Sequence, residues 1–285
     1  MIEAGTSVAT ARDEMKSYYE KSFKMRQRFI ELFSNLGFGH LTTAFSETEI
    51  LIALFEKIMR FDEDKKPIDK FILSKGHGAG MVYPILEDMG IFSKEEINAM
   101  VRIGGDLTKI REFVYPGFEF YGGSLGIGIG MAAGLALGLK QNREDSSVFC
   151  LCGDAECYEG SVWEAMLFAA HNRLNNLVVI VDRNYLGVSD FTENMCAIEP
   201  FADKWKSCNW DVSEINGHSY EELFDTLENV YKRPSCKPLC IIADTVKGKG
   251  INDLCNIPLR HGYMPTGENA NEVMKKLEQF GYERI

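Results

Sequence analysis

Runs of consecutive apolar residues recur along the chain, each bounded by polar or turn-forming residues. They have the length of buried β-strands, and they cover residues 69–73, 147–152, 176–182 and 238–244. Several intervening segments space their apolar residues three or four positions apart, as amphipathic helices do. Continuous apolar strands that alternate with helices are typical of a buried parallel sheet. The sequence therefore predicts an α/β fold with a parallel sheet flanked by helices on both faces.

Short polar signals mark the expected beginnings of helices. Thr10 and Asp13 precede a long apolar stripe and predict where the first helix begins. Capping-box patterns, in which Ser precedes Glu by three positions, occur at residues 46–49, 93–96 and 219–222. These boxes predict helices before and after the first strand and before the last one.

The chain shows no repeat, low-complexity segment or Pro/Gly-rich linker that would divide it. Its 285 residues, 45% of them hydrophobic, are enough for a substantial core. A helix from about Glu156 to Arg173 is expected to connect two of the strands. We expect a single domain, residues 1–285, with a helical N-terminal extension.

Glycine recurs every fourth residue in the apolar segment 124–140. Gly126, Gly130, Gly134 and Gly138 would form one smooth face of a helix, which a neighbouring helix can approach closely. The segment is short for a membrane span. We expect this face to pack against another helix, either inside the domain or at a subunit interface.

Charge and cysteine usage exclude several classes of protein. The formal net charge is −11 and is spread along the chain, which argues against binding to nucleic acid or to an anionic membrane. The N-terminus lacks a basic segment followed by an apolar one, so we expect no signal peptide and a cytoplasmic protein. The eight cysteines form no CxxC pair, as is typical of reduced core thiols. A zinc site at Cys236 and Cys240 is disfavoured.

Two hard oxygen ligands end neighbouring predicted strands. Asp154 follows the strand at 147–152, and Asn184 follows the strand at 176–182. Parallel strands place their carboxyl ends at one edge, where α/β proteins bind ligands. With the carbonyl of Leu186, these side chains could hold Mg²⁺ against a diphosphate at a helix N-terminus. Asp154 equally suits a helix N-cap and Asn184 a turn, so the spacing alone leaves both interpretations open.

A wider pattern favours the metal site. Residues 153–184, "GDAECYEGSVWEAMLFAAHNRLNNLVVIVDRN", resemble the thiamine diphosphate signature, in which Gly-Asp precedes Asn by about thirty positions. The "EGSVWEA" portion is similar to transketolase. Other blocks that resemble transketolase follow one another along the chain: "GHLTTAFSETEILIALF", "DKFILSKGHGAGMVYPIL", "GGSLGIGIGMAAGLALG", "ADTVKGKGI" and "RHG". The sequence is identified as a member of the transketolase family, covering its N-terminal, diphosphate-binding part.

The resemblance assigns roles to residues by their position. It implies a metal site formed by Asp154, Asn184 and the carbonyl of Leu186. It implies catalytic residues, which are His40, His77, His261 and Glu159. It implies cofactor contacts from His77, Gly123, Ser124, Leu125, Gly153, Asp154, Ala155, Glu159, Asn184 and His261. The histidines would contact cofactor phosphate and substrate hydroxyls, and the glutamate would link to the activating glutamate of a partner active site.

The remaining basic residues are interpreted more plainly. His171 lies on a predicted helix and His218 precedes a capping box, and both are taken as structural. Lys247 and Lys249 in "KGKG" could screen phosphate charge, and they suit a solvated surface equally well.

The resemblance also implies a reaction and a second chain. Transketolases use thiamine diphosphate and Mg²⁺ to transfer a two-carbon ketol unit from a ketose to an aldehyde. They continue with a pyrimidine-binding domain and a C-terminal domain, which are not expected here. The glutamate that activates the cofactor would then come from a separate subunit, in an α2β2 assembly with active sites at the subunit interfaces.

Three departures from the family pattern affect the expected pocket. Ala155 stands where Gly is usual, which excludes glycine-only backbone angles after Asp154. Gly187 stands about where a glutamine is common. The usual GHP segment, whose histidine touches the donor sugar, is not recognisable in residues 106–123. We expect a reshaped donor end of the pocket and a modified sugar as substrate, in place of the central pentose phosphates.

Two other functions remain open at this point. The chain could be the α subunit of a 2-oxo acid dehydrogenase, although "WEA" and the Gly-His loops favour transketolase. It could be a non-catalytic homologue that acts as a scaffold, although it retains Asp154, Asn184 and Glu159. A dinucleotide site is disfavoured because "GIGIG" at 126–130 lacks the GxGxxG spacing.

Overall fold

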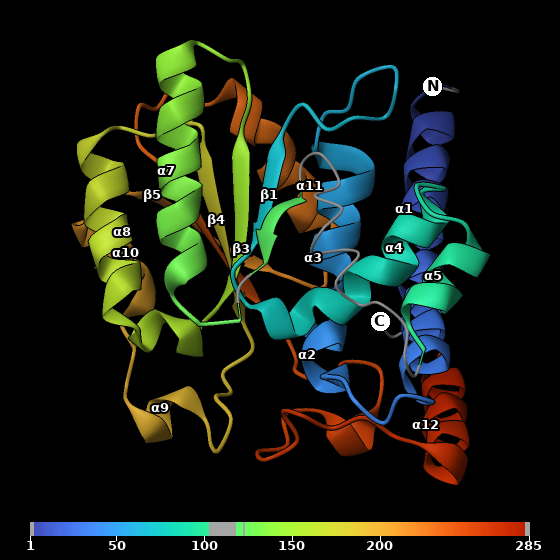
Figure 1. Ribbon diagram of the computed structural model, residues 1–285. Helices are drawn as coiled ribbons and strands as arrows, with labels where there is room; N and C mark the ends of the chain where they lie inside the picture. Colours follow the sequence, from blue (N-terminus) through green and yellow to red (C-terminus); the bar gives the residue numbers. More distant parts are fainter. Residues whose placement is uncertain (1–2, 103–117, 122, 283–285) are drawn as a thin grey trace.

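Six parallel strands form one sheet in the order β2-β1-β3-β4-β6-β5 (Figure 1). The computed structural model describes residues 3–102, 118–121 and 123–282. The strands are β1 (Lys70–Leu73), β2 (Phe118–Tyr121), β3 (Val148–Gly153), β4 (Leu177–Arg183), β5 (Asp211–Asn216) and β6 (Leu239–Asp244). The predicted α/β fold with a parallel sheet is confirmed.

The apolar runs predicted the four inner strands of the sheet but not the two edge strands. The apolar runs correspond to β1, β3, β4 and β6, and every residue of β4 is buried. The missed strands, β2 and β5, lie at the two edges of the sheet. In β5 only Ile215 is buried. An edge strand has a single neighbour, so its residues are not required to form the continuous apolar run by which an inner strand is recognised.

The register of the sheet aligns the carboxyl ends of three strands. Gly153 of β3 pairs with Asp182 of β4, and Asp182 pairs with Ala243 of β6. The segments that follow these strands therefore leave the sheet at one edge, as predicted for Asp154 and Asn184.

Helices cover both faces of the sheet (Figure 1). One face packs against α1 (Glu3–Phe33), α2 (Leu41–Ser46), α3 (Thr48–Ala53), α4 (Val82–Asp88), α5 (Lys94–Met100), α11 (Tyr220–Glu228) and α12 (Gly267–Phe280). The other packs against α7 (Ile127–Asn142), α8 (Gly160–His171) and α10 (Phe201–Ser207). Successive residues of β3 alternate between the two cores, because strand side chains point to opposite faces in turn.

Shorter helical turns lie in the connecting segments. They are α9 (Thr192–Met195), a π-helical turn (Leu54–Ile58) and 3₁₀ turns at Gly76–Met81, Ala155–Tyr158, Asn229–Lys232 and Asn252–Leu254. The helix expected from Glu156 to Arg173 is therefore a 3₁₀ turn followed by α8.

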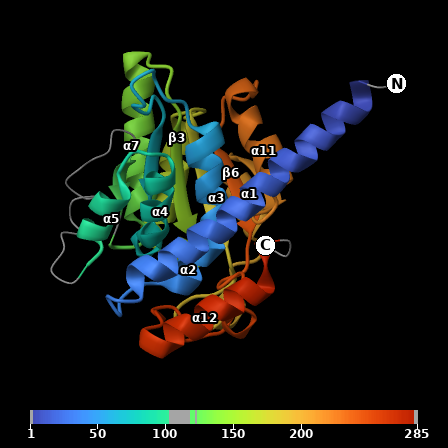
Figure 2. The ribbon, with the colours of Figure 1, turned by 90° about the vertical axis from the view of Figure 1, so that its right-hand side faces the viewer.

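Helix α1 begins earlier than the sequence indicated. It runs across α3, α4 and α11, and its first turns extend beyond them (Figure 2). The predicted beginning at Thr10 and Asp13 is wrong, because the helix starts at Glu3. Adding residues to an existing helix costs far less free energy than nucleating one. The helix can therefore continue in the N-terminal direction past residues that could have capped it.

The three capping boxes have three different outcomes. The box at 93–96 is confirmed, with the Ser93 hydroxyl and the Glu96 carboxylate each bonded to the other residue's N–H. At 219–222 the Ser219 side chain caps α11, and Glu222 binds the N–H of Asn216. The box at 46–49 is wrong, because its residues are buried and serve tertiary contacts.

The glycine face of α7, formed by Gly130, Gly134 and Gly138, is open. A Cβ placed on any of the three would meet no atom within 4 Å among the described residues. The prediction that the glycine face packs inside the domain is therefore wrong for these three glycines in the described part of the chain, and packing at a subunit interface stays a prediction. Gly126 precedes the helix with φ 81°, and a Cβ there would lie 2.5 Å from the Ser161 hydroxyl. In the described ranges, no helix has both the length and the apolar composition needed to cross a bilayer.

Candidate active site

A cavity of about 660 Å³ opens at the carboxyl edge of the sheet. Most of the predicted site residues line it: His40, His77, Gly123, Leu125, Gly153, Asp154, Ala155, Asn184, Leu186 and His261. They come from segments that follow β1, β3 and β4 and from the segments before α2, α7 and α12. Ser124 and Glu159 are exposed and lie outside the lining.

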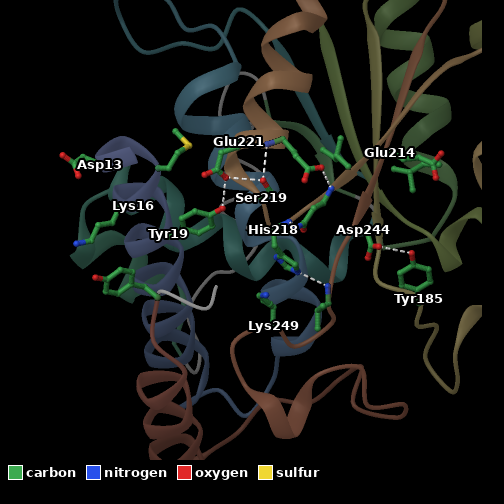
Figure 3. A pocket seen from close by; sticks show the side chains of 17 residues that line it. Asp13, Lys16, Tyr19, Tyr185, Glu214, His218, Ser219, Glu221, Asp244 and Lys249 are labelled. Atoms are coloured by element: carbon green, nitrogen blue, oxygen red, sulfur yellow. Dashed lines mark hydrogen bonds between the residues drawn. The ribbon is translucent and has the colours of Figure 1, made fainter. Parts of the chain in front are cut away.

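A larger and more open cavity of about 1550 Å³ lies beyond the ends of β5 and β6 (Figure 3). Its polar side chains bind one another, as where the Tyr19 hydroxyl donates to Glu221 at 3.0 Å. His218 bonds through Nδ1 to Glu49 at 2.8 Å and accepts the N–H of Val246 at 2.9 Å, which confirms its structural role. Because none of the predicted site residues lines this cavity, we place the candidate site in the smaller one.

Three histidines meet in the smaller cavity although they are far apart in the sequence. The ring centres of His40 and His77 are 5.4 Å apart, those of His40 and His261 are 5.0 Å apart, and those of His77 and His261 are 4.6 Å apart. Lys247 donates from Nζ to Nδ1 of His261 at 3.2 Å. The histidines therefore form one cluster beside a buried ammonium group.

The environment of the cluster keeps its imidazoles neutral. Burial lowers the pKa of all three histidines, and nearby lysines lower it further. The pKa of His261 falls to about 3 through burial and the charge of Lys247. Burial also lowers the pKa of Lys247 to about 8, so this ammonium stays largely charged at pH 7. A neutral imidazole can accept a proton at one nitrogen while donating one from the other.

Acidification is expected to destabilise the fold through His77. Its pKa is 6.5 in the unfolded chain and lower in the folded one, so below pH 6.5 the unfolded state binds more protons. The unfolding free energy should fall by about 1.4 kcal/mol per pH unit for this residue as the pH drops. Denaturant titrations at pH 7, 6 and 5 give the unfolding free energy at each pH. Its slope against pH between pH 6 and pH 5 should be lower by about 1 kcal/mol per unit in His77→Asn than in the wild type.

The control for this prediction is His171→Asn, at an exposed histidine that ends α8. It should retain the slope of the wild-type chain. Because Asp154 and Glu47 also titrate in the folded protein, the comparison between variants isolates His77. Equal slopes in the wild type and His77→Asn would count against the neutral cluster.

Asp154 begins the turn that follows β3 and is buried. Its Oδ1 accepts the N–H of Ala155 at 2.7 Å, so the predicted N-cap interaction is present. Its Oδ2 accepts the N–H of Tyr185 at 2.7 Å and a guanidinium N–H of Arg183 at 3.1 Å. Burial raises the pKa of Asp154 to about 6, against the opposing effect of Arg183. The carboxylate is therefore ionised at pH 7 and bonded across to the segment after β4.

Asn184 and Leu186 lie in that segment, on either side of a strained residue. Tyr185 has φ 62°, a left-handed conformation that costs a residue with a Cβ about 1 kcal/mol. This conformation directs the Tyr185 N–H to Asp154 and leaves the Leu186 carbonyl 3.5 Å from Nζ of Lys247. Asn184 Oδ1 accepts the N–H of Leu186 at 3.2 Å. Strain of this kind concentrates at functional sites.

Comparison with known proteins decides the family. Residues 23–284 match the family model described as "Transketolase, thiamine diphosphate binding domain". The chain belongs to the transketolase family.

Its relatives include both short and long transketolases. The chain is 33% identical to an apulose-4-phosphate transketolase subunit of Phocaeicola vulgatus, over 91% of this chain and 93% of that protein. It is 32% identical to the 6-deoxy-6-sulfo-D-fructose transketolase subunit SqwG of Clostridium sp. (90% and 94%). Human transketolase is 31% identical over 93% of this chain, which spans 43% of the human protein.

The fold of this transketolase-family chain also matches a solved structure. Transketolase from Campylobacter jejuni superimposes with a TM-score of 0.79 at 26% identity, over 93% of this chain and 42% of that one. The matched portion is the thiamine diphosphate-binding domain, for which the family uses a divalent metal ion as well.

The residues present fit the cofactor of transketolases. Asp154, Asn184 and Leu186 offer a carboxylate, an amide and a carbonyl oxygen, and hard cations such as Mg²⁺ prefer oxygen ligands. A single carboxylate lies among these donors, and no group of three His, Cys, Asp or Glu side chains that could hold a metal occurs among the described residues. Buried Lys247 beside these donors suits an anionic group.

Lys75, Asp182 and Glu47 form a buried ionic cluster that no pattern in the sequence indicates. Lys75 donates to Asp182, and its Nζ lies 2.9 Å from Glu47 Oε2. Burial opposes the charge on Lys75, yet the two carboxylates raise its pKa above the usual range. Burial also raises the pKa of Glu47 to about 7. Because Asp182 accepts an N–H of Asn184 at 3.1 Å, the cluster holds a candidate ligand in place.

Glu156 is a further residue of the site that no pattern in the sequence indicates. Its Oε1 accepts the N–H of Gly126 at 2.8 Å and the hydroxyl of Ser74, and its Oε2 accepts the N–H of Gly153 at 3.0 Å. One carboxylate therefore joins the end of β1, the beginning of α7 and the end of β3. No periodicity signals such a contact, because its partners lie 30 or more positions away, except for Gly153.

Ala155 is compatible with its place in the turn. It is absent from the residues with positive φ, so no glycine-only conformation is needed. We expect Ala155→Gly to leave the affinity for thiamine diphosphate unchanged and to lower the unfolding free energy by about 0.5–1 kcal/mol, because glycine loses more backbone entropy on folding. Calorimetry and denaturant unfolding would measure the two quantities. Tenfold tighter binding of thiamine diphosphate by Ala155→Gly would contradict this explanation.

Proposed function

We propose that this chain is the thiamine diphosphate-binding subunit of a two-subunit transketolase, which transfers a two-carbon ketol unit from a ketose to an aldehyde. The observation that carries the proposal is the convergence of three histidines with the oxygen donors of Asp154, Asn184 and Leu186 at one cavity. Membership of the transketolase family supports this assignment.

The roles of the residues follow from their chemistry. When bound, thiamine diphosphate would supply the carbon nucleophile that attacks the ketose carbonyl. Asp154, Asn184 and the Leu186 carbonyl would hold Mg²⁺ against the diphosphate, and the charge of Lys247 would favour its phosphate oxygens. The neutral histidines would bind substrate hydroxyls and move their protons during bond cleavage and formation.

A modified sugar is the proposed substrate class. Two of the similar proteins are named for apulose 4-phosphate and for 6-deoxy-6-sulfo-D-fructose. The unrecognisable GHP segment at 106–123 supports the same proposal from the sequence, although residues 103–117 and 122 lie outside the described part of the chain.

A second protein chain is proposed to complete the active site. The similar proteins of Phocaeicola vulgatus and Actinobacillus succinogenes are themselves named as transketolase subunits. In this chain the glycine face of α7 and the side chains of Ile127 and Met131, 45% and 44% exposed, leave a smooth apolar surface close to the cavity. Exposed Glu159 lies at the same end of α7, where it packs near Gly126. We propose that a subunit with the pyrimidine-binding domain and the activating glutamate docks here, in an α2β2 assembly.

Gly134→Leu should separate assembly from folding. The new side chain enters open space and replaces glycine in a helix, so the isolated chain should gain about 0.8 kcal/mol of stability. Complex formation with the partner should weaken, as measured by light scattering after gel filtration. Lys275→Leu, an exposed change on α12, is the control and should leave the complex intact. Full assembly of the Gly134 variant would place the partner elsewhere.

Assays of the chain with its partner subunit would test the activity. Ketol transfer from ketose donors to aldehyde acceptors should require the partner, thiamine diphosphate and Mg²⁺. Decarboxylation of a 2-oxo acid, with no ketol transfer, would support the dehydrogenase alternative. Absence of cofactor binding with and without the partner would support a scaffold. Turnover of xylulose 5-phosphate and ribose 5-phosphate as efficient as in an ordinary transketolase would reject the modified sugar.

A further inference from the structure

Arg183 brings a permanent positive charge to the candidate metal site. It ends β4, directly before Asn184, and its side chain is 2% exposed. A guanidinium nitrogen donates to Oδ2 of Asp154 at 3.1 Å. The carboxylate that would serve as a metal ligand therefore already has a cation at hydrogen-bond distance.

Other contacts fix this guanidinium in place. The nitrogen bonded to Asp154 also donates to Thr192 Oγ1 at 2.9 Å. The second nitrogen donates to Glu199 at 2.8 Å and to Glu193 at 3.3 Å. The guanidinium carbon lies 4.3 Å from the centre of the Tyr185 ring. Because none of these contacts involves Asp154, the positive charge would remain beside the site if the carboxylate turned to a metal ion.

The other end of the donor set is also beside a cation. Nζ of Lys247 lies 3.5 Å from the Leu186 carbonyl oxygen and is buried. The nearby carboxylate of Asp182 is bonded to Lys75. Asp154 is the one carboxylate among the three donors, and each of the two cations lies within hydrogen-bond distance of a donor.

The carboxylates that hold the far side of the guanidinium balance it only in part. Glu193 and Glu199 are 39% and 54% exposed, so water screens their charge more than it screens the buried contact between Arg183 and Asp154. A divalent ion entering alone would therefore be repelled by the buried cations more strongly than the exposed carboxylates attract it.

We propose that Arg183 makes metal binding at this site conditional on a diphosphate. Its charge lowers the affinity for a divalent ion that arrives alone, and the negative charges of a bound diphosphate restore it. The proposal rests on the proposed function, because it takes Asp154 as a metal ligand. Arg183 acts through Asp154 and is a positioning residue, not a catalytic one.

Binding of Mn²⁺ to the full chain, followed by electron paramagnetic resonance, tests the proposal without an activity assay. Wild-type chain should bind Mn²⁺ weakly alone and far more tightly with thiamine diphosphate or inorganic pyrophosphate. Arg183→Gln should bind Mn²⁺ alone about 10- to 100-fold more tightly than the wild type, because one positive charge beside the ion is removed. A residue with a merely structural role would not gain affinity when replaced.

Several variants keep the test decisive. Arg183→Met fills the same space beside Tyr185 and replaces the Gln variant if that one does not fold. Glu199 binds the guanidinium and is 54% exposed. Glu199→Gln removes the charge of this carboxylate and keeps the guanidinium of Arg183, so this variant should bind Mn²⁺ as the wild type does. Adding Asp154→Asn to Arg183→Gln should abolish the gained affinity, which locates the ion.

Two results would overturn the proposal and leave the proposed function standing. The first applies once the wild type has been shown to bind Mn²⁺ together with thiamine diphosphate. It is a folded Arg183 variant that binds Mn²⁺ alone no more tightly than the wild type does. The other is wild-type chain that binds Mn²⁺ equally well with and without a diphosphate. A wild-type complex that binds neither Mn²⁺ nor thiamine diphosphate would overturn the proposed function together with this inference.

Discussion

Asp154→Ala should remove the Mg²⁺-dependent binding of thiamine diphosphate, with a loss of affinity of at least about 100-fold. Asp154 is the only carboxylate among the three proposed ligands, and it joins the turn after β3 to the segment after β4. Alanine would remove the charged ligand and would free the N–H of Tyr185 and the fixed charge of Arg183. Titration calorimetry with thiamine diphosphate, with and without Mg²⁺ and with the partner subunit present, would measure the loss.

The comparison needs one variant inside the site and one outside it. Asp154→Asn preserves the shape and an oxygen donor without the charge, so it separates the charge from the packing. Asp203→Ala, whose side chain is 70% exposed on α10, should bind the cofactor normally. If Asp154→Ala retained cofactor binding that still depended on Mg²⁺, the assignment of the metal site would be rejected.

Lys75→Met should lower the unfolding free energy by about 3–5 kcal/mol. Lys75, Glu47 and Asp182 are all essentially inaccessible to solvent. Removing the ammonium leaves two buried carboxylates without their cation, which costs more than the ion pairs themselves contribute. Denaturant unfolding of the two chains at pH 7 would give the difference.

The pH dependence of this loss has a definite sign. Unpaired buried carboxylates hold their protons to higher pH in the folded chain than in the unfolded one. The unfolded state therefore releases protons first, and Lys75→Met should be more destabilised at pH 8 than at pH 5. Lys75→Met/Asp182→Asn should recover part of the stability, and Lys94→Met, at an exposed position of α5, should change little. A loss below about 1 kcal/mol would contradict this account of the cluster.

The sequence predicted the elements whose residues repeat a local pattern. Strands β1, β3, β4 and β6 are buried on both faces and show it as continuous apolar runs, whereas edge strand β5 does not. The convergence of Asp154 and Asn184 was predictable because parallel strands share a carboxyl edge. The three histidines were identified from a family pattern, and the structure gathers them in one cavity.

Residues that act through distant partners were not predictable in this way. Lys75 pairs with a carboxylate 107 positions away, and Arg183 with one 29 positions away. The false capping box at 46–49 has the same origin. Ser46 donates to Asp182, and Glu49 binds Arg26, so both residues belong to long-range contacts. Single-sequence patterns carry no information about which distant charges meet.

The three hydrogen bonds of Glu156 define a part of the pocket whose segments are held together. Gly126, Ser74 and Gly153 converge on this one carboxylate, so their segments cannot diverge independently. In residues 106–123, which end at Gly123, the usual GHP segment of the family is not recognisable. An ancestral enzyme could therefore acquire a new sugar by changing that upstream segment while the cofactor end was preserved. Grafting substrate specificity between relatives should accordingly place the upstream junction no later than Gly123.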